Sequence, residues 1–206
     1  MTRIRKNPAE RRQEFMDRSM ELFCTKGYEQ TMVQDICRAV GVAKGTFFYY
    51  FPTKEDVLKA IFANWVKQFE EDFIYKAKGM TAAEQLKLFL NMSSQDNAIE
   101  PLVDKLMEEG QWDMVRNLWQ LVLEQSFNPL MLRILAKGKQ EGSMQVDYQA
   151  ESLDFFWNLM DVVWPIEQQA NSADENVSVR EAIAAKLIES LFGMKPGSLA
   201  HFGDTV

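Results

Sequence analysis

Apolar side chains recur every three or four residues along almost the whole chain, and no stretch alternates between apolar and polar residues as a half-buried β-strand does. The order of helix-start signal, periodic run and glycine repeats down the chain. The expected helices span residues 8–26, 32–40, 44–50, 54–77, 82–93, 100–109, 111–140 with a break near Pro129, 149–170 and 178–192. This pattern predicts an all-α protein of about nine helices.

Local capping chemistry gives the expected helix ends. The start signals are Asn7-Pro8-Ala9-Glu10, Thr31-Met32-Val33-Gln34, Thr81-Ala82-Ala83-Glu84, Asn128-Pro129 and Ser178-Val179-Arg180-Glu181. The stop signals are Gly27, Gly41, Gly79, Gly110, Gly142 and Gly193. We therefore expect Thr31 and Asn128 to be N-caps, and each of these glycines to end a helix.

Residues 31–50 have the layout of a helix-turn-helix unit. Val33, Ile36, Cys37 and Val40 fall on one face of the first helix, Gly41 ends it, and a second short helix begins near Ala43. A helix, a short turn that contains glycine and a second helix form the unit that places its second helix in the DNA major groove. DNA is therefore a candidate partner.

The second helix carries five adjacent aromatic residues, 47–51, and they cannot all face inward. Phe47 and Phe51 are four residues apart and are expected to pack inside. Lys44, Gly45 and Thr46 then form an exposed first turn, where a glycine lets the backbone approach a ligand closely. DNA contact is the favoured role for Tyr49 and Tyr50, and packing in the core is the alternative. Lys54, at the start of the next helix, is expected to bind phosphate.

Charge supports a polyanion partner at one end of the chain. The 206 residues carry a net charge of −7. Residues 1–56 have a net charge of +2, with ten Lys and Arg against eight Asp and Glu, and the remainder has −9. A basic end on an acidic body suits DNA binding, although a solvated basic tail is equally consistent with the charge alone. The change near residue 56 predicts two domains, residues 1–56 and 57–206.

The stretch from Phe15 to Leu58 resembles the DNA-binding domain of TetR-family transcriptional regulators. The resemblance rests on Leu22-Phe23, Gly27-Tyr28, Thr31, Val33, Asp35-Ile36, Gly41-Val42, Lys44-Gly45-Thr46-Phe47, Phe51 and Lys54-Glu55. Together with the resemblance, the residue chemistry gives the expected DNA contacts: Thr31, Gln34, Lys44, Gly45, Thr46, Tyr49, Tyr50 and Lys54. Gln34 has an alternative role as the third residue of a capping box. Phe48 departs from the family, which usually has a phosphate-binding tyrosine there.

The resemblance also implies a C-terminal domain that dimerises through its last two helices and encloses a ligand pocket. The last helix has a broad apolar face made of Val179, Ile183, Leu187 and Leu191 with Ala184 and Ile188 beside them. The preceding helix offers Leu153, Phe156, Met160 and Val163. Core packing within one subunit is the alternative for these residues. The candidate ligand-binding residues are Trp119, Trp157 and Asp161, because an acid beside tryptophans can hold a cationic aromatic ligand. A tryptophan stripe in the core is the alternative.

Few residues in the chain could support catalysis or bind a metal. Cys24 and Cys37 are the only cysteines and His201 the only histidine, so a zinc site and a Ser/His/Asp triad are unsupported. We expect no enzyme activity, no cofactor and no metal. No signal peptide or membrane span is recognised, and a cytoplasmic location is expected.

Together these features predict a homodimeric DNA-binding transcriptional regulator. The resemblance implies a repressor on a palindromic operator, released by a small hydrophobic or aromatic effector that shifts the helix starting near Lys54. One alternative is a helix-turn-helix DNA-binding or interaction protein without a small-molecule inducer, and another is an enzyme.

Overall fold

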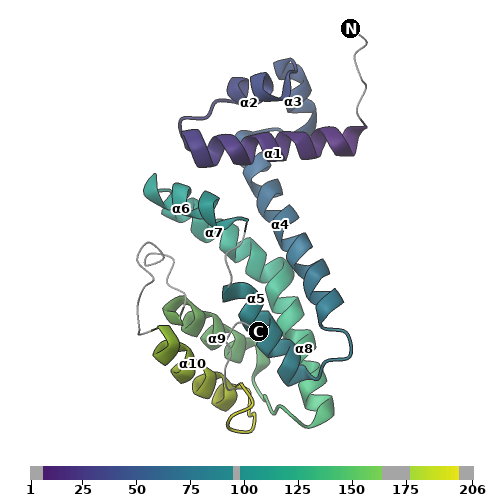
Figure 1. Ribbon diagram of the computed structural model, residues 1–206, viewed down its shortest axis with the longest axis vertical. Coiled ribbons are helices and arrows are strands. Elements are labelled where there is room, and N and C mark those ends of the chain that lie inside the picture. Colours follow the sequence, from purple (N-terminus) through teal and green to yellow (C-terminus); the bar gives the residue numbers. More distant parts are fainter. Residues whose placement is uncertain (1–6, 95–97, 164–176, 200–206) are drawn as a thin grey trace. The chain divides into compact units, whose positions relative to one another are not determined.

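The computed structural model describes residues 7–94, 98–163 and 177–199, and every regular element in them is a helix (Figure 1). The elements are α1 (Pro8–Lys26), α2 (Val33–Val40), α3 (Lys44–Tyr50), α4 (Lys54–Lys76), α5 (Ala82–Ser94), α6 (Glu100–Glu108), α7 (Trp112–Val122), the π-helical η1 (Leu123–Phe127), α8 (Asn128–Glu141), α9 (Gln149–Val163) and α10 (Val177–Leu191). The all-α prediction is confirmed. The basic residues before Asn7, the end of the helix predicted to reach residue 170, and His201 lie outside the described residues.

Most of the predicted helix ends are confirmed. Asn7 and Glu10 form a reciprocal capping box at the start of α1, with the Glu10 amide 3.0 Å from the Asn7 side-chain oxygen. Thr81 and Glu84 do the same before α5. All six stop signals, Gly27, Gly41, Gly79, Gly110, Gly142 and Gly193, have a positive φ.

The expected cap at Asn128 is wrong. α7 continues through η1 into α8, and the residue before α8 has helical backbone angles without a side-chain cap. Pro129 has no N–H to donate within the helix, so a π-helical turn before it replaces the predicted break. The side-chain oxygen of Asn128 instead accepts a hydrogen bond of 2.6 Å from the indole of Trp157.

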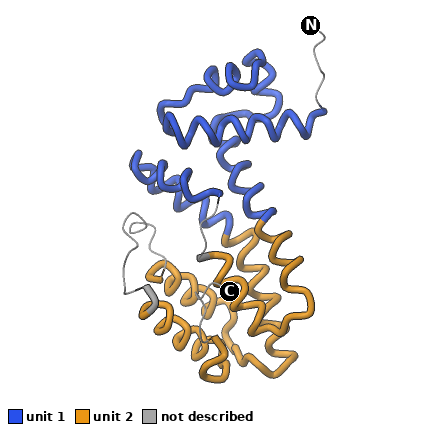
Figure 2. Tube along the Cα trace, viewed as in Figure 1, with its two compact units in different colours: residues 1–68, 97–122 blue, residues 69–96, 123–206 orange. Residues whose placement is uncertain are grey.

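The chain folds into two compact units (Figure 2). Unit 1 comprises residues 1–68 and 97–122, and unit 2 comprises residues 69–96 and 123–206. Unit 1 therefore contains the whole of α1, α2, α3, α6 and α7 and most of α4. The domain boundary near residue 56 stays a prediction.

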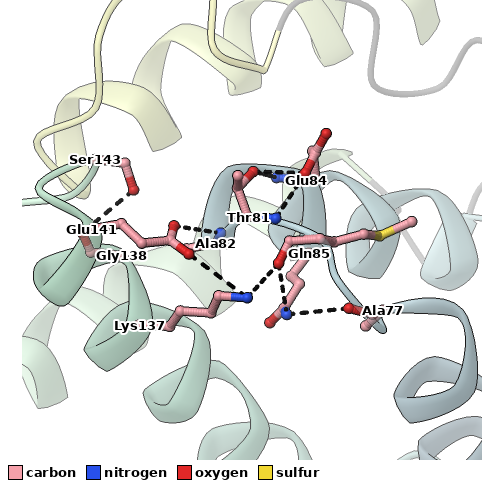
Figure 3. Close-up of polar contacts among 10 residues, drawn as sticks. Ala77, Thr81, Ala82, Glu84, Gln85, Lys137, Gly138, Glu141 and Ser143 are labelled. Carbon is pink, nitrogen blue, oxygen red and sulfur yellow. Dashed lines mark hydrogen bonds and ion pairs between the residues drawn. The ribbon is translucent and has the colours of Figure 1, made fainter.

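Unit 2 is held together by an aromatic core and by polar contacts between α5 and α8. Phe89 lies edge-on to Phe127 at 5.4 Å between ring centroids. Glu141 on α8 accepts a 2.8 Å hydrogen bond from the Ala82 amide at the start of α5, and the Lys137 ammonium donates to the Met80 carbonyl (Figure 3). The carboxylate therefore satisfies one of the free amides of an N-terminal helix turn and ties two helices together.

Candidate nucleic-acid interface

α1 provides the apolar surface on which the helix-turn-helix folds. Phe15 is fully buried, and its ring lies 5.5 Å from the Phe47 ring, 6.2 Å from that of Phe51 and 5.6 Å from that of Tyr50. Edge-to-face packing of this kind is favourable beyond the area it buries. The aromatic cluster therefore fixes α3 on α1, and the predicted inward packing of Phe47 and Phe51 is confirmed.

The turn between α2 and α3 follows the predicted helix-turn-helix geometry. Gly41 has left-handed backbone angles, φ 74° and ψ 38°, which a residue with a side chain adopts only at a cost. The Val42 amide donates to the Cys37 carbonyl at 3.0 Å and closes the end of α2. α3 then begins at Lys44 without a side-chain cap.

The predicted N-cap of α2 is wrong by one residue. Met32 is the N-cap, and its amide donates to the Asp35 carboxylate at 3.0 Å. Thr31 is buried, and its hydroxyl donates to the Gly27 carbonyl at 2.6 Å. Its burial does not favour the predicted DNA contact, because the hydroxyl already has a partner inside the protein. Gln34 is exposed and lies outside the cap, so its side chain is available for DNA.

The first turn and the outer face of α3 present the other predicted DNA contacts. Lys44 and Gly45 are exposed, Thr46 and Tyr50 are half-buried, and Tyr49 is 78% exposed. A Cβ built on Gly45 would have no atom within 4 Å, so packing within the protein does not require a glycine here. The absence of that side chain leaves the backbone of α3 open to a close approach from outside.

Phe48 also lies at this surface, at the position where the family usually has a tyrosine. Its side chain is 47% exposed, and the Lys44 ammonium lies 5.7 Å from the centre of its ring. A cation over an aromatic face is attracted to the ring electrons. Phe48 therefore positions Lys44, although it has no hydroxyl to donate to a phosphate.

Lys54 is directed into unit 1. Its ammonium donates to the Tyr28 carbonyl at 2.6 Å and lies 4.0 Å from the centre of the Tyr28 ring. Burial lowers the pKa of Lys54, and the carboxylates of Glu29 and Glu109 partly oppose this effect. The described geometry therefore gives Lys54 a role in holding the turn between α1 and α2, and its predicted phosphate contact needs a side-chain rearrangement.

The two cysteines do not form a reactive site. Cys24 is half-buried and Cys37 is buried, and neither is in a disulfide. Burial raises the pKa of both thiols, which leaves less of the reactive thiolate. Among the described residues, no cluster of His, Cys, Asp and Glu could hold a metal ion, and no helix is long and apolar enough to cross a membrane.

The predicted ligand-binding residues lie in different units. Trp119 is in unit 1, edge-on to Phe62 at 6.2 Å and to Trp65 at 5.6 Å. Trp157 is in unit 2, stacked on Phe127 at 6.1 Å. Asp161 has an exposed side chain, although nearby protein atoms desolvate its carboxyl enough to raise its pKa. Both tryptophans pack against aromatic neighbours, as core residues do, and their role toward a ligand stays a prediction.

An open groove of about 290 Å³ lies on unit 1 between the start of α4 and α7. It is lined by Glu55, Lys59, Gln111, Asp113, Met114, Asn117, Leu118 and Leu121. No pattern in the sequence predicts this groove, because its two lining segments, 55–59 and 111–121, are about fifty positions apart.

Comparison with known proteins identifies the helix-turn-helix. Residues 15–61 match the family of bacterial regulatory proteins of the tetR family. The chain is 38% identical over 82 residues to the fatty acid metabolism regulator protein of Bacillus subtilis (strain 168), a match covering 38% of this chain and 41% of that relative. It is 25% identical over 162 residues to the HTH-type transcriptional repressor KstR2 of Rhodococcus jostii (strain RHA1), covering 75% of this chain and 76% of the relative. The first of these matches therefore spans less than half the length of the relative.

Solved structures share the fold over most of the chain. Salmonella enterica GusR superimposes with a TM-score of 0.68 and 17% identity, covering 91% of this chain and 98% of that one. The regulator FadR from Bacillus subtilis, solved in complex with stearoyl-CoA, superimposes with a TM-score of 0.64 and 22% identity, covering 85% and 97%. The match of residues 15–61 covers α2, α3 and the parts of α1 and α4 that support them. Residues 15–61 therefore match the helix-turn-helix region of the tetR family of bacterial regulatory proteins.

Proposed function

We propose that the chain is a homodimeric transcriptional repressor that binds a palindromic DNA operator and is released from it by a small-molecule effector. The observation that carries the proposal is the outer face of α3, where Lys44, Gly45 and Tyr49 are exposed while Phe47 anchors the helix from behind. α3 of each subunit enters one major groove, as the second helix of this motif does. A regulator of bacterial DNA works in the cytoplasm.

Each side chain on this face has a specific role in the proposal. The Lys44 ammonium contacts a phosphate or a guanine edge, and Thr46 donates to a phosphate or touches a thymine methyl. Tyr49 and Tyr50 donate their hydroxyls to the DNA backbone. Gln34, at the start of α2, is exposed, and its side-chain amide can donate a hydrogen bond to the DNA backbone.

The effector is a small hydrophobic or aromatic molecule. Two structural relatives support a ligand-responsive regulator: FadR was solved in complex with stearoyl-CoA, and a transcriptional regulator from Saccharomonospora viridis in complex with choline. Trp119, Trp157 and Asp161 are the proposed contacts in this chain. The effector releases the operator only if it binds the DNA-incompetent arrangement more tightly, and α4, starting at Lys54, is the proposed moving element.

A regulator without an inducer is the second candidate. The aromatic packing around Trp157 favours it, because its ring contacts Phe89, Phe127 and Phe156 as a core residue does. Thermal unfolding with candidate effectors separates the two functions, since a ligand that binds the folded state raises the midpoint and one that does not bind leaves it unchanged.

A salt titration tests the DNA-binding proposal. The purified protein is first used to select its preferred duplex from a random library, and the affinity is then measured over a range of salt concentrations. Lys44→Ala is expected to weaken binding and to reduce the salt slope of the dimer by about two, because one phosphate contact is lost in each subunit. Lys139→Ala is the matched control, since Lys139 is an exposed lysine on α8, outside the proposed DNA-binding and dimer surfaces.

Two outcomes would contradict the proposal. If no duplex is enriched in the selection, the chain does not act as a sequence-specific regulator. If the Lys44 and Lys139 variants lower the salt slope equally, the outer face of α3 is not the DNA-binding surface.

A further inference from the structure

The turn between α1 and α2, residues 27–32, is bonded to a part of the chain about eighty residues away, within unit 1. Glu109 is the C-cap of α6 and is half-buried. One oxygen of its carboxylate, Oε2, accepts hydrogen bonds from the amides of Tyr28 at 2.9 Å and Glu29 at 3.3 Å. The bonds join a charged acceptor to backbone donors, so they are stronger than bonds between neutral groups.

The Glu109 carboxylate also lies directly against the backbone of Gly27. A Cβ built on Gly27 would lie 1.9 Å from Glu109 Oε1, so any side chain at this position would displace the carboxylate. Gly27 thus has two functions in the same place, because it ends α1 with a positive φ and leaves room for Glu109. The Glu109 carboxylate therefore packs closely against the α1–α2 turn, with both of its oxygens near the backbone.

Two further side chains hold the same turn. Gln111, just before α7, donates to the Glu29 carboxylate at 3.0 Å. Lys54, at the start of α4, donates to the Tyr28 carbonyl at 2.6 Å. The turn is therefore bonded on one side to the corner between α6 and α7, residues 109–111, and on the other side to α4.

The position of residues 27–32 determines how α2 begins. The Thr31 hydroxyl donates to the Gly27 carbonyl, and the next residue, Met32, is the N-cap of α2. α2 leads through Gly41 into α3, the proposed reading helix. A displacement of residues 27–32 would therefore tilt α2 and move α3 with it.

We infer that Glu109 couples the corner between α6 and α7 to the helix-turn-helix, so that a movement of this corner changes DNA affinity through the α1–α2 turn. This route is separate from the proposed movement of α4, and its effect on DNA rests on the proposed function. Glu109 is a positioning residue and does not touch DNA itself. Its removal should alter affinity without altering the salt slope, because no phosphate contact is lost.

Hydrogen exchange tests the contact without any DNA. In Glu109→Ala the amides of Tyr28 and Glu29 lose their acceptor, and their exchange measured by NMR should become about tenfold faster or more. Glu108→Ala is the matched control, because Glu108 is the exposed neighbour, paired with Lys105 at 2.9 Å, and the two amides should exchange as in the wild type. Glu109→Gln keeps one acceptor oxygen and should give intermediate rates even if the alanine variant folds poorly. If the amides of Tyr28 and Glu29 exchange equally fast in the wild type and in the three variants, the inference is wrong.

A double-mutant cycle tests the coupling to DNA. Gly110→Ala strains the corner, because Gly110 has a φ of 74°. Introduced into the wild type, the substitution should lower affinity for the selected duplex about 5-fold or more. Introduced into Glu109→Ala, it should have little further effect. Multiplicative effects of the two changes would show that Glu109 transmits nothing. If the wild type binds no duplex, the proposed function fails, whereas the exchange measurement still decides whether Glu109 holds the turn.

Discussion

Gly45 lies in the first turn of α3, where a residue with a side chain would fit without contact to any atom within 4 Å. Glycine lowers helix stability by about 1 kcal/mol relative to alanine, so packing alone gives no reason for its presence. Close approach of the DNA backbone does give one.

Gly45→Ala is therefore expected to separate stability from DNA binding. Urea unfolding should show an unchanged or higher free energy of unfolding, by up to about 1 kcal/mol, because alanine favours the helix. Affinity for the selected duplex, measured by fluorescence anisotropy, should fall roughly tenfold or more because the new methyl group separates α3 from the DNA. A variant that binds DNA as well as the wild type would show that the backbone does not approach the duplex at Gly45.

Tyr28 makes the α1–α2 turn sensitive to alkaline pH. Its side chain is only 5% exposed, and burial together with the carboxylates of Glu55, Glu29 and Asp56 raises its pKa to about 12. The pKa of a tyrosine in an unfolded chain is about 10. The neutral phenol therefore favours the folded state below pH 10, and this contribution is lost as the pH rises from 10 to 12, because the unfolded state loses its proton first.

The comparison of wild type with Tyr28→Phe isolates this effect. Urea unfolding at pH 9 and pH 11.5 should show that the wild type loses roughly 1 to 2 kcal/mol more stability than the variant over this range. Lys54 is present in both proteins, and its lowered pKa acts in the opposite direction in both. An equal loss in the two proteins would mean that Tyr28 ionises as readily in the folded state as in the unfolded chain.

At the level of helices, local chemistry predicts the ends well and distant contacts poorly. The reciprocal caps at Asn7 and Thr81 and the glycine stops depend on residues within one turn of the helix end, and the sequence shows all of them. The caps at Thr31 and Asn128 were predicted wrongly because Asp35 and Pro129 offered competing local solutions. Periodicity predicted the inward packing of the rings of α3 for the same local reason.

The candidate site was less predictable where residues far apart in the sequence meet. Nothing near Glu109 in the sequence indicates that its carboxylate accepts hydrogen bonds from the turn at Tyr28, 81 positions away. The place of Lys54 in the first turn of a helix predicts a phosphate contact, and no local pattern indicates the Tyr28 carbonyl that accepts its hydrogen bond. Trp119 and Trp157 lie on helical stripes of the same kind, yet they belong to different units.

Glu189 fixes the end of α10 to the segment that follows it. Its buried carboxylate accepts hydrogen bonds from the amides of Gly197 at 2.9 Å and Leu199 at 2.7 Å. Leu199 is fully buried, so its amide has no access to water once the carboxylate is removed. The carboxylate thus replaces the solvent for a stretch of backbone that has no regular secondary structure of its own.

Glu189→Ala is expected to lower the free energy of unfolding by about 2 to 3 kcal/mol, because it leaves buried amides without an acceptor. Glu189→Gln keeps one oxygen and should lose about half as much. Lys139→Ala removes an exposed charge from α8 in the same unit and should change stability by less than about 0.5 kcal/mol in the same urea titration. If the alanine variants of Glu189 and Lys139 are equally stable, the carboxylate does not hold the segment.

At the scale of the whole molecule, α9 and α10 each expose apolar side chains that the described residues do not cover. Other residues expected at the dimer face pack in the core instead: Leu153, Phe156, Met160, Val163, Ala184 and Ile188 are buried. The exposed large side chains on these helices are Phe155, Val162, Val179, Ile183 and Leu187. Val179, Ile183 and Leu187 are four residues apart along α10, so they form one stripe, and each is at least half exposed. A large apolar surface of this kind favours association, and a second copy of the chain is the proposed partner.

Replacing both Ile183 and Leu187 by glutamate is expected to convert the proposed homodimer into a monomer. Two charges buried on each side of a two-fold interface would have no partners, so the dissociation constant should rise roughly 100-fold or more in sedimentation equilibrium. Ile74→Glu is the matched control, because Ile74 is an equally exposed isoleucine on α4. If the double variant dimerises as the wild type does, this face is not the interface.

The same double variant predicts how DNA affinity depends on dimerisation. A dimer that holds one half-site of a palindrome presents its second α3 to the other half-site at high effective concentration, whereas a monomer has no such advantage. The monomeric variant should therefore bind the full palindrome and an isolated half-site with the same affinity per site, while the wild type should prefer the palindrome by at least about 100-fold. Titrating both proteins on both duplexes measures this preference, and a preference retained by the monomer would mean that each chain reads its half-site independently of the other.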